Sequence, residues 1–152
     1  MNEALLRLAQ RLHLGSADNK SLRLEFGLAC VVRVEHLLED PAVVDCLGAF
    51  SRHVRDGGAE VTELSALTVK AAELANQHQG SKSIDGCGHA AVSATFAVAN
   101  AIAGKALQAA DYAAYALVYA QSGYGAVAER ESFDAEFGWQ VARLQSIGKP
   151  RG

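Results

Sequence analysis

Apolar residues recur along the chain at intervals of three and four positions, which is the spacing of one face of an α-helix. Val43, Leu47 and Phe50 form one such stripe, and Phe133, Phe137, Val141 and Leu144 form another. No run alternates apolar and polar positions over the length that a strand requires, so no strand is expected. The pattern predicts an all-α protein, a single-domain bundle of about seven helices spanning residues 1–152.

Glycine, proline and capping residues indicate where these helices begin and end. Asp40 before Pro41 is typical of an N-cap followed by proline in the first turn. Ser132 is the expected cap of the C-terminal helix, 132–147, and Ser83 or Asp85 that of the helix from Cys87. Gly57-Gly58 and Gly80 are expected stops. The expected helices are 2–13, 20–38, 41–56, 62–79, 87–103, 107–121 and 132–147, and 16–19 is a polar connector, so that 1–19 forms an N-terminal helix and connector.

Alanine is the most informative residue for packing. The chain contains 29 alanines and only two prolines, a composition that favours helix. Two stripes of alanine recur at helical spacing: Ala90, Ala94, Ala97 and Ala101, then Ala106, Ala109, Ala113, Ala116 and Ala120. Small side chains let two helix backbones approach closely, so residues 88–121 are expected to form a central helical hairpin around which the other helices pack.

The charge and the hydropathy of the chain argue against nucleic-acid binding, a membrane span and a signal peptide. The net charge of −3 gives no electrostatic reason to expect nucleic-acid binding. The segment 90–120 carries only two charges, Lys105 and Asp111, but Gly104 divides it into halves of about 15 residues, and a spanning helix needs about 20. No membrane span is therefore expected. Residues 1–7 lack the uncharged core of a signal peptide, so the cytoplasm is the expected location.

Candidate catalytic and metal-binding groups are sparse. The three cysteines have no CxxC spacing, and free thiols in a reducing compartment are expected. His36 and Glu39 form one i, i+3 pair, whereas a metal site in a bundle usually combines such pairs from two helices. Cys87 beside His89 has no evident oxyanion hole or orienting group. We therefore expect no enzyme activity, no metal and no cofactor.

Two sets of residues are candidates for contact with a partner or ligand. On the expected helix 20–38, the residues Glu25, Glu35, His36 and Glu39 share one side, where the like charges of Glu35 and Glu39 repel. This acidic stripe is either a recognition surface for a basic partner or a solvated helix face. Trp139 falls off the apolar stripe of its helix and is either an exposed anchor or packed on a neighbouring helix.

The second set is aromatic. Tyr112, Tyr115 and Tyr119 lie at i, i+3 and i+7 with Asp111 beside the first, and His89 stands at the start of the preceding helix. Such tyrosines usually line the core margin, each hydroxyl reaching a buried polar partner. The alternative is a polar or ligand site formed by His89, Asp111, Tyr112 and Tyr115.

Several of these segments together resemble a known family. They are Arg23 to Cys30, Glu35 to Glu39, Gly88 to Ala91 and Tyr112 to Ala116. The likeness, over residues 21–120, is to the alanine-rich, all-helical immunity proteins of bacterial polymorphic toxin systems, a group similar to the fifth immunity-protein family. An acidic segment leading to Arg-Pro and a tryptophan, common in that family after the second helix, are not present here. The resemblance implies a protein that binds and neutralises a toxin and catalyses nothing.

Three functional hypotheses follow. The first is a non-catalytic immunity protein whose partner is a basic toxin domain. The second is a self-associating helical scaffold or accessory protein, since a homo-oligomer is compatible with the sequence. The third is a small-molecule-binding or metal-binding helical bundle.

Overall fold

The computed structural model describes residues 2–56, 61–78, 87–127 and 129–148, with the backbone alone at 61–62, 87–88 and 122–127. Over these ranges it contains helices and no strand, so the all-α, single-domain fold is confirmed. The α-helices are α1 (Glu3–Arg11), α2 (Lys20–Val32), α3 (Pro41–Arg55), α4 (Val61–Gln77), α5 (Cys87–Ile102), α6 (Ala106–Val127) and α7 (Asp134–Gly148). Three short 3-10 helices join them: η1 (Ala17–Asn19), η2 (Glu35–Leu37) and η3 (Arg130–Phe133).

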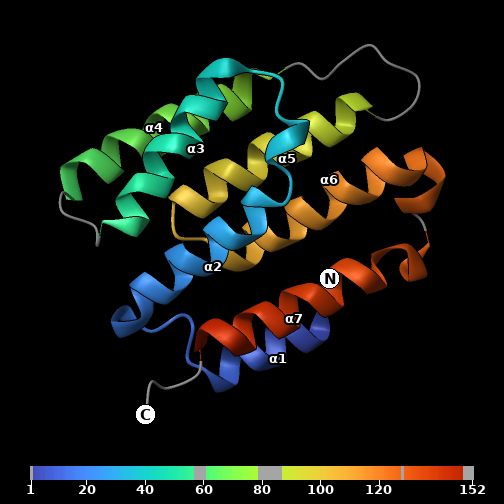
Figure 1. The fold of residues 1–152 in the computed structure, drawn as a ribbon, viewed down its shortest axis with the longest axis horizontal. Helices are drawn as coiled ribbons and strands as arrows, with labels where there is room; N and C mark the ends of the chain where they lie inside the picture. The colour runs from blue at the N-terminus through green and yellow to red at the C-terminus, as the bar shows by residue number, and fades with distance from the viewer. Residues whose placement is uncertain (1, 57–60, 79–86, 128, 149–152) are drawn as a thin grey trace.

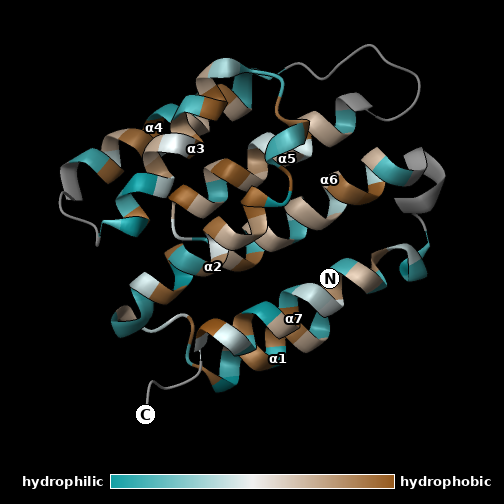
Figure 2. Cartoon of the chain, viewed as in Figure 1, coloured by the Kyte–Doolittle hydropathy of each residue, from teal (hydrophilic) through white to brown (hydrophobic). Residues whose placement is uncertain are grey.

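The helices are arranged around α5 and α6, which run side by side through the middle of the molecule (Figure 1). Helix α2 packs against both of them. Helices α3 and α4 pair on one side of this group, with α4 against α5, and α1 and α7 pair on the other. Figure 2 shows apolar residues concentrated along α5 and α6 and polar residues spread over the outer helices.

A tight turn connects α5 to α6. Gly104 adopts the left-handed conformation, with φ of 79°, which glycine reaches without a steric penalty. Its N–H donates to the carbonyl of Ala101 and the N–H of Lys105 donates to that of Asn100, the pair of bonds that defines a Schellman motif. The carbonyl of Lys105 already accepts the first bond of α6, from Ala109. The two helices are therefore joined with almost no intervening loop.

Alanine side chains of α5 and α6 are deeply buried. Ala94, Ala97, Ala101, Ala109, Ala113 and Ala116 are each 0% exposed. Helix α2 also approaches closely: a Cβ added to Gly27 would stand 3.2 Å from the Cβ of Ala101. Because these side chains are small, the spacing of the three helices is set by backbone atoms more than by side-chain volume.

The end of α2 differs from the sequence expectation. A single helix was expected to run to residue 38, but α2 ends at Val32 and η2 follows. From this point the N–H of Val34 donates to Val31 and that of Leu37 to Val34, so i→i+3 bonds replace those of an α-helix. Three β-branched valines at 31, 32 and 34 lower the helix propensity here, which favours the break.

Of two expected N-caps in the described residues, one is confirmed and the other is wrong. The Asp40 side chain accepts a hydrogen bond from the N–H of Ala42 at 2.9 Å, with Pro41 in the first turn, as expected. Ser132 does not cap α7, because it lies inside η3, where its N–H donates to Glu129. The expected stops at Gly57-Gly58 and Gly80 and the caps Ser83 and Asp85 lie outside the described residues.

A buried polar network joins α1, α6 and α7. The Asn2 Oδ1 accepts from the N–H of Leu5 and caps α1, while its Nδ2 donates to the carbonyl of Phe137 and to Gln140 Oε1, each at 3.2 Å. Gln140, which is 0% exposed, donates through Nε2 to the carbonyl of Ala110 at 2.9 Å. The network satisfies these side chains and fixes the register of α1 on α7.

Candidate functional site

Aromatic rings from four helical segments form a row on the protein. We call it the aromatic row: His89 and Phe96 of α5, Tyr112, Tyr115 and Tyr119 of α6, Phe133 of η3 and Phe137 of α7. His89 stacks on Tyr119 with ring centroids 5.3 Å apart, and Tyr119 lies 6.5 Å from Tyr115. The packing holds the rings in fixed positions on helices, so the surface is preorganised.

The middle of the aromatic row is both supported and accessible. Tyr115 meets Phe133 edge to face at 5.2 Å, and Tyr112 stacks on Phe96 at 5.4 Å. Tyr112 and Tyr115 are nevertheless 38% and 39% exposed. Their hydroxyls make no hydrogen bond to any residue that the structure describes, so the expectation that they reach buried polar partners is wrong. Both tyrosines are instead partly open to solvent.

Asp111 does not join these tyrosines. It lines a cavity of about 210 Å³ together with Asn2 and Leu5 of the α1 side and Gln108 of α6. Burial raises the pKa of its carboxyl above the usual value. The expected set of His89, Asp111, Tyr112 and Tyr115 therefore separates into the aromatic row and a carboxyl that faces α1.

Replacing Asp111 by asparagine is expected to raise the thermal stability at neutral pH. Because burial raises the folded-state pKa above 3.8, the folded protein holds this proton more tightly than the unfolded chain does. The ionised carboxylate therefore costs stability above the folded-state pKa, and this cost disappears as the pH falls below the unfolded value. Melting curves of the parent and Asp111→Asn between about pH 3 and 7 measure the difference. Asp45→Asn, at an exposed site on α3, is the control, and an Asp111→Asn protein less stable than the parent at neutral pH would contradict the assignment.

The acidic candidates are exposed but do not form a stripe on one helix. Glu25 lies on α2, Glu35 and His36 belong to η2, and Glu39 follows η2 in the connection to α3. The break after Val32 removes the i, i+4 relation between Glu35 and Glu39 that the sequence suggested. Glu39 Oε1 lies 3.7 Å from Nε2 of His78, so this carboxylate has a neighbour of its own. Glu35, His36 and Glu39 therefore lie in the connection between α2 and α3, and Glu25 lies on α2.

Trp139 packs against the core, and the guanidinium of Arg33 lies over its ring. The guanidinium carbon of Arg33 stands 4.0 Å from the centroid of its ring, a cation–π contact, and the ring is half-buried. Of the two alternatives left open by the sequence, the structure shows contact with a neighbouring helix region rather than an exposed anchor.

The same arginine forms an ion pair that the sequence did not reveal. Arg33 donates from Nε to both carboxylate oxygens of Glu136, at 2.9 and 3.1 Å, and from Nη2 to Oε2 at 2.7 Å. The side chain of Glu136 is 7% exposed, whereas that of Arg33 is 37% exposed. Glu136 lies three residues after Phe133 and four before Gln140, on the buried face of α7. This helical spacing from Phe133 is the one sequence feature that could have predicted that Glu136 is buried.

No group of three or more His, Cys, Asp or Glu side chains suited to a metal occurs within the described ranges. Cys30 and Cys46 are buried free thiols. Burial raises the pKa of both, most strongly that of Cys30, which disfavours the reactive thiolate. The side chain of Cys87, considered above beside His89, lies outside the described residues.

Over the part of the chain that the structure covers, no helix has the length and apolar character needed to cross a bilayer. Comparison with known proteins adds no relative: no protein-family model, no curated protein and no solved structure matches this chain.

Proposed function

We propose that this chain is a non-catalytic binding protein of the immunity type, which neutralises a toxin domain by holding it on the aromatic row. The observation that carries the proposal is the meeting of two sequence segments in space. Gly88 to Ala91 and Tyr112 to Ala116, both part of the resemblance to immunity proteins, contribute His89, Tyr112 and Tyr115 to the aromatic row, where Tyr119 links His89 to Tyr115 and where Tyr112 stacks on Phe96.

Exposed tyrosines on rigid helices suit a protein interface. Tyrosine is enriched among the residues that dominate binding energy, because its ring buries a large area and its hydroxyl still forms a hydrogen bond. Rings that are already stacked lose little conformational freedom on binding, which preserves affinity. Tyr112 and Tyr115 are accordingly the side chains on which we expect binding to depend most.

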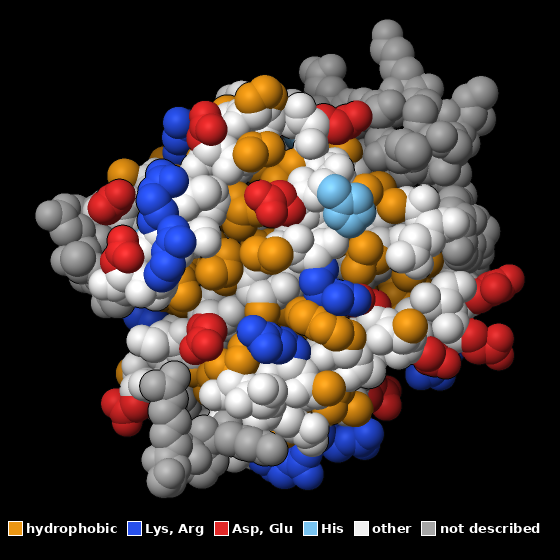
Figure 3. Space-filling model, viewed as in Figure 1, with side chains coloured by type: hydrophobic (Ala, Val, Ile, Leu, Met, Phe, Trp, Pro, Cys, Tyr) orange, Lys and Arg blue, Asp and Glu red, His pale blue; other side chains and the backbone are white. Residues whose placement is uncertain are grey.

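The charge beside the aromatic row favours a basic partner. Glu129, Glu131 and Asp134 are exposed in and around η3, next to Phe133, with Arg130 as the basic residue among them. Figure 3 shows acidic side chains gathered at the edge of the molecule where η3 lies in Figure 1. Such a border steers a cationic domain toward the rings and raises its association rate at low salt.

The test is direct binding to the product of the adjacent gene, measured by calorimetry and by stopped-flow at two salt concentrations. Tyr115→Ala and Tyr112→Ala are each expected to weaken binding by about tenfold or more. Val69→Ala, at a 59% exposed position on α4, is the matched control and should leave affinity unchanged. Glu131→Lys combined with Asp134→Lys should slow association and reduce its salt dependence.

Each other outcome has a defined meaning. Absence of binding at micromolar concentration would overturn the proposal. Binding that survives both tyrosine substitutions but is lost in Glu35→Lys/Glu39→Lys would move the interface to the η2 corner. A parent protein that is dimeric, and becomes monomeric in Tyr115→Ala, would favour the self-associating scaffold instead.

A further inference from the structure

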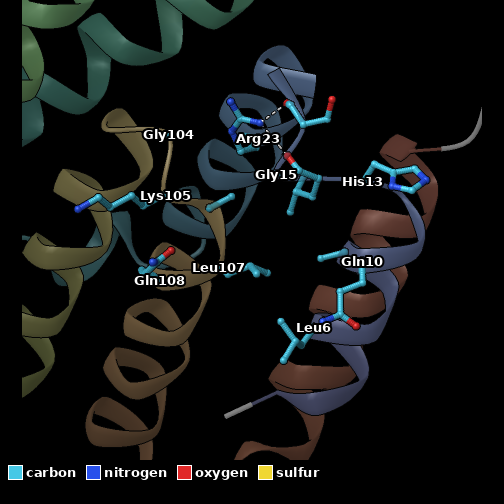
Figure 4. Close-up of a pocket in the computed structure, with 13 residues that line it drawn as sticks. Leu6, Gln10, His13, Gly15, Arg23, Gly104, Lys105, Leu107 and Gln108 are labelled. Atoms are coloured by element: carbon cyan, nitrogen blue, oxygen red, sulfur yellow. Dashed lines mark hydrogen bonds between the residues drawn. The ribbon is translucent and has the colours of Figure 1, made fainter. Parts of the chain in front are cut away.

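A second surface feature, away from the aromatic row, is a cavity between α1 and the beginning of α6. Its volume is about 580 Å³, within the range of roughly 300–1,000 Å³ that is usual for small-molecule sites. Figure 4 shows Leu6 and Gln10 of α1 facing Leu107 of α6 across this space, with the Gly104 turn at one end. The cavity is therefore lined by helices α1, α2 and α6 together with the turns that follow α1 and α5.

The floor of the cavity is apolar. Leu6, Ala9 and Leu14 line it from the α1 side, and Ala106 and Leu107 from α6. Leu6 is 36% exposed, whereas its neighbours Leu5 and Leu8 on α1 are buried. The smaller cavity beside Asp111 shares Leu6, Leu107 and Gln108 with this one, so the apolar floor extends along α6. A hydrocarbon chain or ring would gain by covering this floor.

The charged residues that line the larger cavity are all basic or, for histidine, basic when protonated: His13, Arg23 and Lys105. Arg23 donates from Nη1 to the carbonyls of Leu14 and Ser16, at 2.8 and 2.6 Å, which holds its guanidinium at the end of the cavity near the turn. Its Nε and Nη2 form no hydrogen bond to any described residue. In Figure 4 the side chains of Lys105 and His13 lie on opposite sides of this space, and both extend outward from it. The carboxyl of Asp111 stands at the other end, in the smaller cavity.

The start of α6 adds to the positive potential at this end. Lys105 precedes the first turn of the helix, and a lysine side chain has no acceptor atom with which to cap the first N–H groups. Ala106, Leu107 and Gln108, which carry these amides, are all lining residues. The amides and the helix dipole favour a negative charge here.

We propose that this cavity binds an amphiphilic carboxylate, a molecule with one anionic head and a hydrocarbon body. The head lies near Arg23 and Lys105, and the hydrocarbon runs along Leu6 and Leu107. The opposite orientation would bring the head to Asp111, whose like charge disfavours it.

Octanoate is the probe. Two reference compounds separate the contributions of its two parts: 1-octanol has the hydrocarbon chain without the charge, and acetate has the charge without the chain. Calorimetric titration is expected to show one equivalent of octanoate bound, with octanol several-fold weaker and acetate undetectable. Amide resonances of 106–108 should shift with octanoate more than with octanol.

Two variants locate the site. Leu6→Trp should fill the floor and weaken octanoate binding by about tenfold or more, because leucine is partly exposed there and the fold can accept the larger ring. Val69→Trp, on the exposed face of α4, is the control for adding a surface tryptophan. Lys105→Glu should weaken octanoate about two- to fivefold without affecting octanol, as expected for an exposed charge, whereas Lys70→Glu should change neither.

Equal affinity for octanoate and octanol, binding of many equivalents, or unchanged binding in Leu6→Trp would each overturn the proposal. If octanoate fails to bind and Leu6→Trp converts a dimer into a monomer, the cavity is a contact between copies of the chain. Binding of octanoate is independent of the toxin partner, so either proposal can fail alone.

Discussion

Replacing Arg33 by methionine is expected to lower the free energy of unfolding by about 2–3 kcal/mol. The substitution keeps an unbranched apolar stem over Trp139 but leaves the carboxylate of Glu136 buried without its cation. Breaking a fully buried pair typically costs about 3–5 kcal/mol, and the 37% exposure of the arginine side chain reduces that figure here. For a chain of this size the melting temperature should fall by roughly 5–10 °C, which circular dichroism measures.

The double variant Arg33→Met/Glu136→Leu is the control for this prediction. Because it removes both charges, it should recover most of the loss, since a buried pair can be replaced by apolar groups with little effect. A double variant as unstable as Arg33→Met would mean that the arginine stabilises the protein through its cation–π contact with Trp139 and not through the ion pair.

Replacing Ala113 by leucine is expected to destabilise the protein by roughly 1–3 kcal/mol. Ala113 is 0% exposed on α6, which packs along α5, so three further carbon atoms would have to displace the groups that surround it. Ala97→Leu, at a 0% exposed site on α5, should have a similar effect. Urea denaturation of both variants gives the free energies.

Ala72→Leu serves as the matched control, because Ala72 is exposed on α4 and leucine is a good helix former. It should leave the midpoint almost unchanged. If Ala97→Leu and Ala113→Leu denature at the same urea concentration as the parent, the two helices can separate at little cost, and close backbone approach does not stabilise the bundle.

Local signals explain why the fold class could be predicted. Apolar stripes, the Asp40-Pro41 cap and the glycine at 104 act within one or two turns of the chain, so the sequence carries their meaning without tertiary information. The helices at 41–56, 62–79, 87–103 and 107–121 were placed close to α3, α4, α5 and α6 for this reason. Helix α6 continues to Val127 past an expected end at residue 121, since no proline stops it.

The long-range contacts of the candidate site could not be predicted in the same way. Arg33 and Glu136 are separated by 103 positions, and no local sequence pattern near either residue indicates which residue it pairs with. The buried face of α7 also differs from the one that the apolar stripe predicts. The apolar stripe favoured Phe137 and Val141, which are half-buried, whereas Glu136 and Gln140 are buried. Polar residues can occupy the core only where partners such as Arg33 and Asn2 satisfy them, and sequence periodicity does not show those partners.

The aromatic row was partly visible in the sequence. The spacing of Tyr112, Tyr115 and Tyr119 predicts one helical face, and the structure shows that Tyr115 and Tyr119 are neighbours. Its extension to His89, Phe133 and Phe137 depends on how α5, η3 and α7 dock, which no local pattern determines.

The hydrogen bond from Asn2 to the carbonyl of Phe137 spans 135 positions of sequence, and this separation has a consequence during synthesis. A ribosome adding about 5–20 residues per second makes α1 roughly 7–27 s before the residues that pair with it. During that interval the nascent chain carries an amphipathic helix whose apolar side, Leu5, Leu8 and Ala9, has no α7 to cover it. The contact between α1 and α7 can form only after residues 134–148 have left the ribosome.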